Sequence, residues 1–131
     1  LQSYSVRLAP SVVTLNSLLK RFGREGWEYV ENDPENKHIN YTRNPLAGVN
    51  QLVAVMGATE LALPQIQAPL LLVQGSKDPT VSPESAQLIF EKAGAADKEM
   101  IVLERARHGI INGDGSETVY GHVLEYLNRL K

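Results

Sequence analysis

Cysteine is absent from this chain of 131 residues, and its absence excludes three kinds of chemistry at once. Without thiols the chain forms no disulfide, uses no thiolate nucleophile and offers no thiolate ligand to a metal ion. The same composition fits a reducing compartment, so we expect a cytoplasmic protein.

An excess of charge of one sign is also lacking. The chain has 13 Lys and Arg residues against 15 Asp and Glu residues, which gives a formal net charge of −2. Nucleic-acid binding takes most of its affinity from a broad positive field, so we expect no nucleic-acid partner. The hydrophobic share of 43% and the charged share of 21% are those of an ordinary soluble globular protein.

Long runs of apolar residues are missing as well. The longest, such as Pro69 to Val73, fall far short of the roughly 20 residues that cross a bilayer, so we expect no membrane span. No signal-peptide pattern opens the chain, and its first residue is Leu rather than Met. We therefore expect that Leu1 follows an N-terminal part of a longer protein.

The first half of the chain shows helical periodicity on both sides of an irregular stretch. Apolar residues recur every three or four positions from Ser11 to Phe22 and from about Leu46 to Leu61, which predicts two helices. Gly23 to Asn44 is rich in Gly, Asn and Asp and carries scattered aromatic residues, so we predict irregular structure there.

The second half alternates strands with helices. Two short apolar runs, Pro69 to Gln74 and Met100 to Leu103, predict strands, and we expect the first to be buried on both faces. A helix capped by Ser82 and stopped at Gly94 follows the first run, and a helix that opens near Ser116 follows the second. This order implies parallel strands, both of which end at the same edge of one sheet.

The change of pattern near Pro64 sets our domain division. Residues 1–63 form a mostly helical segment, and residues 64–131 form a β/α unit. The fold class is α/β, and we expect strands outside this chain to complete its parallel sheet.

Two loops with polar side chains follow the two predicted strands. Asp78 lies in the loop from Gly75 to Val81, and His108 lies in the loop from Arg105 to Ile110. Neighbouring strands lie about 4.8 Å apart, so these side chains can reach hydrogen-bonding distance if the strands are adjacent. A carboxylate bonded to one imidazole nitrogen leaves the other free to take a proton from a hydroxyl nucleophile. The pair would supply two members of a hydrolase triad.

Both segments resemble sequences of one family. Leu70 to Val81 (LLLVQGSKDPTV) is similar to the acid-bearing strand and turn of α/β-hydrolases of the carboxylesterase and monoacylglycerol-lipase kind. Met100 to Glu104, followed by His108 and a C-terminal helix, is similar to the last strand, base and helix of that family. The resemblance covers about Ala47 to Lys131, and the residues before it look like the variable cap.

This resemblance implies the C-terminal part of an α/β-hydrolase, with residues 1–63 as a cap-like segment and residues 64–131 carrying the acid and base. It implies hydrolysis of a small carboxylic ester through an acyl-enzyme. Asp78 would orient His108, and His108 would act first as general base and then as general acid. Neither a metal nor an organic cofactor is implied.

One part of the family pattern is missing from this chain. The family carries its nucleophilic serine in a G-x-S-x-G turn ahead of the acid, and no such pentapeptide occurs in this sequence. We expect the nucleophile and the oxyanion hole on a missing N-terminal half, which makes the chain inactive by itself. Without that half, the sheet would end in an unpaired strand edge. We therefore expect the isolated chain to self-associate.

Several alternatives stay open. A non-catalytic relative would keep the fold as a binding or interaction module and would lack the G-x-S-x-G turn. A nucleotide- or flavin-binding domain is a further alternative, but Gly75 to Pro79 has too few glycines for a phosphate loop. Asp78 alone could be a turn-former that bonds nearby backbone N–H groups. His108 alone could be a surface histidine.

Aromatic residues of the first segment and arginines beside the predicted base are further candidates for a functional role. Trp27, Tyr29 and Tyr41 either line an acyl pocket or pack the cap, and we favour packing. Arg105 and Arg107 could attract an anionic substrate, yet arginines in an exposed loop are usually solvated. We therefore predict no role for these arginines.

Overall fold

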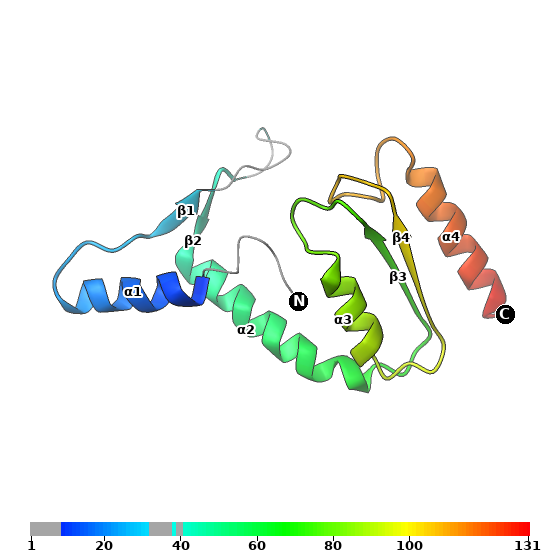
Figure 1. Cartoon of the computed structure of the whole chain (residues 1–131), viewed down its shortest axis with the longest axis horizontal. Coiled ribbons are helices and arrows are strands. Elements are labelled where there is room, and N and C mark those ends of the chain that lie inside the picture. The colour runs from blue at the N-terminus through cyan, green and yellow to red at the C-terminus, as the bar shows by residue number, and fades with distance from the viewer. Residues whose placement is uncertain (1–8, 32–37, 39–40) are drawn as a thin grey trace. The chain divides into compact units, whose positions relative to one another are not determined.

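The computed structural model describes residues 9–31, 38 and 41–131 (Figure 1). Contacts divide the chain between Ala58 and Thr59 into two compact units. We call them the N-terminal unit (Ser5–Ala58) and the C-terminal unit, whose described part is residues 59–131. The division at Pro64 stays a prediction about domains.

The described part of the N-terminal unit begins with a helix, α1 (Ala9–Arg21), where the sequence predicts one. Its last turn carries Lys20 and Arg21, whose positive charges suit the negative end of the helix dipole. The Asn16 side chain on this helix donates a hydrogen bond from Nδ2 to the backbone carbonyl of Trp27 at 2.7 Å. This bond ties α1 to the segment that follows it.

An antiparallel ribbon occupies part of the stretch predicted to be irregular. Its strands are β1 (Tyr29–Glu31) and β2 (Arg43–Pro45), and the Arg43 guanidinium lies 4.7 Å from the centre of the Tyr29 ring. The prediction is wrong at these strands, because three residues are too few to display an alternating pattern. Residues 32–37, 39 and 40 of that stretch lie outside the described residues.

The second predicted helix is confirmed as α2 (Leu46–Ala62), which continues into a short 3₁₀ turn, η2 (Leu63–Gln65). Val49 is buried on α2, and Val53 and Met56 pack against it. These residues are spaced by three or four positions, so one stripe of the helix forms an apolar cluster in the N-terminal unit.

The helical stretch Leu46–Gln65 is long and apolar enough, by length and composition alone, to cross a membrane. It has 20 residues and a mean hydropathy of 1.4, and 17% of its most apolar window is buried within the structure. The core helix of a soluble protein passes the same test. The expectation that the chain has no membrane span therefore stays a prediction.

The C-terminal unit has the predicted order of strand, helix, strand and helix (Figure 1). Its elements are β3 (Leu70–Gly75), α3 (Glu84–Lys92), β4 (Lys98–Leu103) and α4 (Ser116–Arg129). The strands are parallel neighbours, as the sequence predicts, and they pair from Leu70 with Lys98 to Gly75 with Leu103. Both helices contact this sheet, and the strands lie between them in Figure 1.

Strand β3 is less buried than the sequence predicts. Leu70 to Gln74 are half-buried, and only Gly75 is fully buried in β3. Full burial on both faces is therefore wrong for this strand. The strands have one helix on each side, α3 and α4, and two helices leave much of the pleated surface uncovered.

Helix α3 begins and ends slightly differently from the prediction. Pro83, rather than Ser82, holds the N-cap position, and Ser82 contributes its backbone carbonyl to the N–H of Ser85 at 2.9 Å. Gly94 lies just beyond the helix, as predicted. A Cβ atom there would stand 2.1 Å from the carbonyl oxygen of Pro64, so the close contact with η2 requires glycine.

Candidate active site

The loops that follow β3 and β4 are joined by the same kind of backbone bond that joins the strands. The N–H of Lys77 donates to the carbonyl oxygen of Arg105 at 2.9 Å. Gly75 favours this close approach, because a Cβ atom there would lie 3.1 Å from the same oxygen and would push it back by a few tenths of an ångström. The two loops therefore start side by side at the C-terminal ends of the strands.

The two predicted site residues are brought together in these loops. Nδ1 of His108 lies 2.9 Å from Oδ2 of Asp78. The Asp78 side chain is 4% exposed, whereas the His108 side chain is 54% exposed. An ionised carboxylate only accepts hydrogen bonds, so Nδ1 carries the hydrogen and the lone pair of Nε2 is left to accept a proton.

The second carboxylate oxygen of Asp78 binds the backbone of its own loop. Oδ1 accepts hydrogen bonds from the backbone N–H of Thr80 at 2.7 Å and of Val81 at 2.9 Å. Asp78 is therefore a turn-former, as one interpretation of the sequence held. That role is compatible with holding His108, because each role uses a different oxygen.

Gln74 is a neighbour of the carboxylate that the sequence analysis missed. Its Nε2 donates to Oδ2 of Asp78 at 3.3 Å and to the carbonyl oxygen of Gly75 at 3.1 Å. The sequence does show a polar residue, Gln74, near the end of an otherwise apolar strand, and this could have indicated a polar contact there. The direction of its side chain depends on the strand pairing, which the sequence does not show.

Opposing effects act on the pKa of Asp78. Burial raises it, but hydrogen bonds from the Val81 N–H, from His108 and from the Thr80 N–H together hold the pKa below its ordinary value. The carboxyl group is therefore ionised at neutral pH. In that state it can stabilise a positive charge on the neighbouring imidazole.

The lowered pKa of Asp78 predicts a loss of stability in acid. An aspartate in the unfolded chain titrates near pH 3.9, as a rough reference, and the folded carboxyl titrates below that value. The contribution of this group to stability is complete above the unfolded pKa and is lost as the pH falls through the folded pKa. In urea unfolding at neutral and at strongly acidic pH, we expect Asp78→Asn to cost more free energy at neutral pH.

Asp97→Asn is the control for this experiment, because it neutralises an exposed carboxylate in the same unit. We expect the cost of the control substitution to change less between the two pH values. An Asp78→Asn cost that is independent of pH would contradict the lowered pKa.

Arg105 is less solvated than the sequence analysis predicts. Its Nη1 donates to the carbonyl oxygen of Asp114 at 2.8 Å, and its Nη2 donates to that of Gly115. The prediction of a solvated charge is therefore wrong for this residue. No pattern in the sequence indicates these bonds, because they depend on how the loop folds back.

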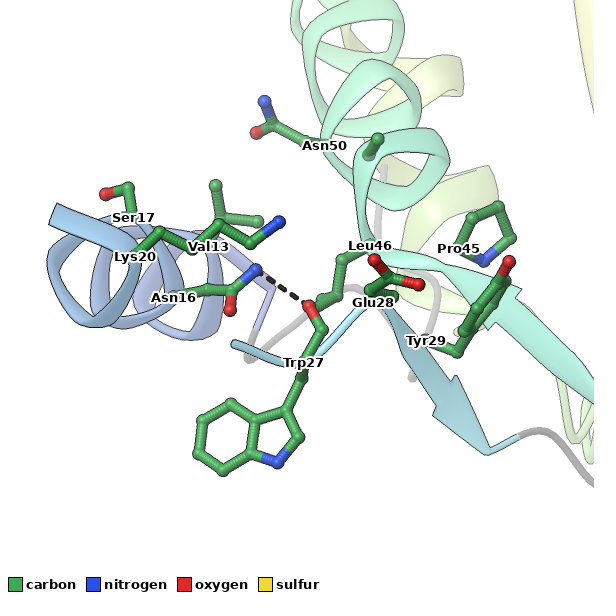
Figure 2. Close-up of a pocket in the computed structure, with 11 residues that line it drawn as sticks. Val13, Asn16, Ser17, Lys20, Trp27, Glu28, Tyr29, Pro45, Leu46 and Asn50 are labelled. Carbon is green, nitrogen blue, oxygen red and sulfur yellow. Dashed lines mark hydrogen bonds between the residues drawn. The ribbon is translucent and has the colours of Figure 1, made fainter. Parts of the chain in front are cut away.

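A cavity of about 480 Å³ lies within the N-terminal unit (Figure 2). Trp27 and Tyr29 line it together with Lys20 of α1 and Leu46 of α2. Tyr41 does not line it and is 87% exposed. That the aromatic residues pack the cap, which the sequence analysis favours over an acyl pocket, stays a prediction.

Comparison with solved structures identifies the class of fold. A chain from work on LipS and LipT, two metagenome-derived lipolytic enzymes, aligns with a TM-score of 0.70 over 95% of this chain at 21% identity. The mouse α/β hydrolase domain-containing protein 10 aligns with a TM-score of 0.61 over 96% of this chain at 13% identity. This chain covers 51% and 49% of those chains. The parallel strands, the crossover helix α3 and the helix α4 are thus part of an α/β-hydrolase fold, as the sequence predicts.

The family follows from the sequence itself. Residues 5–114, which include Asp78 and His108, match the family described as serine aminopeptidase, S33. The chain therefore belongs to this family of α/β-hydrolases.

Individual relatives are lipases and esterases. The thermostable monoacylglycerol lipase of Bacillus sp. (strain H-257) is 30% identical over 76 residues, which are 58% of this chain and 30% of the lipase. Human monoglyceride lipase is 38% identical over 58 residues, which are 44% of this chain and 19% of that protein. Caffeoylshikimate esterase of Arabidopsis thaliana is 28% identical over 92 residues, which are 65% of this chain and 28% of the esterase. The chain thus spans less than a third of each relative, and its predicted likeness to monoacylglycerol lipases is confirmed.

Proposed function

We propose that this chain supplies the acid and base of a serine hydrolase that cleaves carboxylic esters. The observation that carries the proposal is the 2.9 Å hydrogen bond between a buried carboxylate, Asp78, and a half-exposed imidazole, His108. Both lie at the C-terminal ends of parallel strands, where α/β folds hold their active sites. The lipases and esterases among the relatives support an ester as the substrate.

In this proposal the proton moves through Nε2 of His108. The imidazole takes the proton of a serine hydroxyl while the serine oxygen attacks the ester carbonyl, and it then passes that proton to the departing alkoxide. Water next attacks the acyl-serine, gives a proton to His108 and releases the acid as the proton returns to the serine oxygen. Asp78 remains ionised throughout and stabilises the imidazolium.

The nucleophile belongs, in this proposal, to a part of the protein outside this sequence. The family order is serine, then acid, then histidine, and the sequence contains no G-x-S-x-G turn. The small core also supports a missing part of the protein. No large side chain among the described residues is less than 2% exposed. A further part of the protein would cover apolar residues such as Val102, which is 52% exposed on β4. In its absence we expect the isolated chain to self-associate.

Labelling with a fluorophosphonate probe tests this function. We expect the full-length protein to be labelled on one serine within a G-x-S-x-G turn and to hydrolyse a short-chain p-nitrophenyl ester. The chain of 131 residues should be neither labelled nor active. A folded full-length protein that shows neither labelling nor ester hydrolysis would contradict the proposal, and a binding or interaction module would then be the better conclusion.

A further inference from the structure

His108 lies in a loop with little regular structure between β4 and α4. Its side chain is 54% exposed, so about half of its surface is not covered by other residues. One hydrogen bond to Asp78 is a weak restraint, since such a bond contributes only about 1 kcal/mol net in water. The position of the imidazole therefore depends on what holds the backbone of its loop.

The Arg105 side chain joins the beginning of this loop to its end. From its position just after β4, the guanidinium donates to the carbonyl oxygens of Asp114 and Gly115, directly before α4. The backbone of Arg105 also accepts the bond from Lys77 of the acid loop. One residue thus connects the acid loop, the His108 loop and the start of α4.

Two glycines with positive φ lie at the end of the loop, next to arginine guanidinium groups. Gly113 and Gly115 both have a φ of +76°, a conformation that L-residues with side chains rarely adopt. A Cβ atom on Gly115 would lie 2.0 Å from Nη2 of Arg105, and a Cβ atom on Gly113 would lie 2.5 Å from Nη1 of Arg107. The backbone conformation favours glycine at Gly115, and a Cβ atom there would also displace the Arg105 guanidinium from its present position.

A second contact holds the middle of the loop. The hydroxyl group of Tyr120, on the second turn of α4, donates to the carbonyl oxygen of Ile111. The part of the loop that follows His108 is therefore held to α4 through Tyr120 and to the beginning of the loop through Arg105. The limb that precedes His108 is fastened through Arg105.

We propose that Arg105 is a positioning residue that closes the His108 loop onto the start of α4 and thereby holds the imidazole against Asp78. Its catalytic meaning rests on the proposed function, but its effect on the imidazole does not. The planar guanidinium suits this task because it donates two bonds in a fixed fork to two carbonyl oxygens, whereas the ammonium of lysine is a single rotating point charge.

The test is the tautomer of His108 in the chain of 131 residues, measured from the ¹⁵N shifts of its ring in alkaline buffer, where imidazole is neutral. In the original chain the bond to Asp78 should favour the tautomer with hydrogen on Nδ1. Arg105→Gln should shift the population toward hydrogen on Nε2, and Arg105→Lys should give an intermediate population.

Arg129→Gln is the matched control. Arg129 forms an ion pair with Glu99, its side chain is 50% exposed, and it lies on α4 away from the His108 loop. The control removes an arginine contact of the same unit and should leave the tautomer population unchanged. This comparison separates a general loss of stability from a displaced imidazole.

Circular dichroism decides which variant is used. If Arg105→Gln does not fold, Arg105→Lys replaces it, because lysine keeps the charge and the aliphatic stem. A folded Arg105 variant whose tautomer population equals that of the original chain would overturn the proposal, whatever the activity of the full-length protein.

Activity supplies a separate readout. In a full-length protein that hydrolyses esters, Arg105→Gln should lower kcat by about 10²-fold, as a small displacement of a catalytic group does, with little change in KM. An equal loss in the Arg129→Gln control would contradict the proposal. Failure of the proposed function appears instead as an unlabelled full-length protein.

Discussion

Replacing His108 by Ala in the full-length protein is expected to lower ester turnover by about 10³-fold or more while the fold stays intact. The proposed mechanism would lose the imidazole that takes the serine proton, and the hydrogen bond to Asp78 would be lost as well. The measurement is kcat for a short-chain ester, with circular dichroism to verify folding. We expect the loss to fall on kcat rather than on KM, because proton transfer occurs in the transition state.

His122→Ala is the control for this variant. His122 is a half-buried histidine on α4 of the same unit, and it takes no part in the Asp78 hydrogen bonds. We expect turnover in the control to change little. Turnover that is unchanged in His108→Ala would refute the assignment of the base.

Asp78→Asn is expected to lower turnover by about 10⁴-fold, the size of effect that the same substitution has in the triad of a serine protease. The asparagine amide would present hydrogens to Nδ1 of His108, which favours hydrogen on Nε2 and removes the lone pair that takes the serine proton. The bonds from Thr80 and Val81 can still form to the amide oxygen. The turn should therefore persist while the chemistry fails.

Turnover and unfolding by urea should be measured on the same samples of Asp78→Asn at neutral pH. Asp97→Asn is again the control, because it changes an exposed carboxylate to its amide in the same unit. A nearly normal rate in Asp78→Asn would mean that a different carboxylate orients the imidazole.

Much of the C-terminal unit was predictable because its signals are local. The apolar runs that became β3 and β4 are bounded by Gly75 and by polar loops, and the helix after β3 ends near a glycine. Chain order then implies parallel pairing, since a strand, a helix and a strand in succession form a right-handed crossover. Adjacent parallel strands carry their loops to one edge, so the approach of Asp78 to His108 could be expected before any coordinates.

The ribbon of β1 and β2 could not be predicted in the same way. Each strand has only three residues, and Tyr29 pairs with Pro45 across a long separation in sequence. Such strands are stabilised by their pairing and by contacts such as that of Arg43 with Tyr29, rather than by local preference. The sequence shows neither the partner nor the register.

The sequence by itself determined the α/β class, the parallel order of the strands and the places of Asp78 and His108 in the loops that follow them. These features depend on periodicity, turn residues and chain order, all of which can be seen in the sequence. Only the tertiary structure decided that Asp78 serves a turn with one oxygen and His108 with the other, that Gln74 donates to the carboxylate, and that Arg105 closes the loop. Each of these depends on the direction of a side chain relative to a distant backbone group, which is set when the strands pair and the loop folds back.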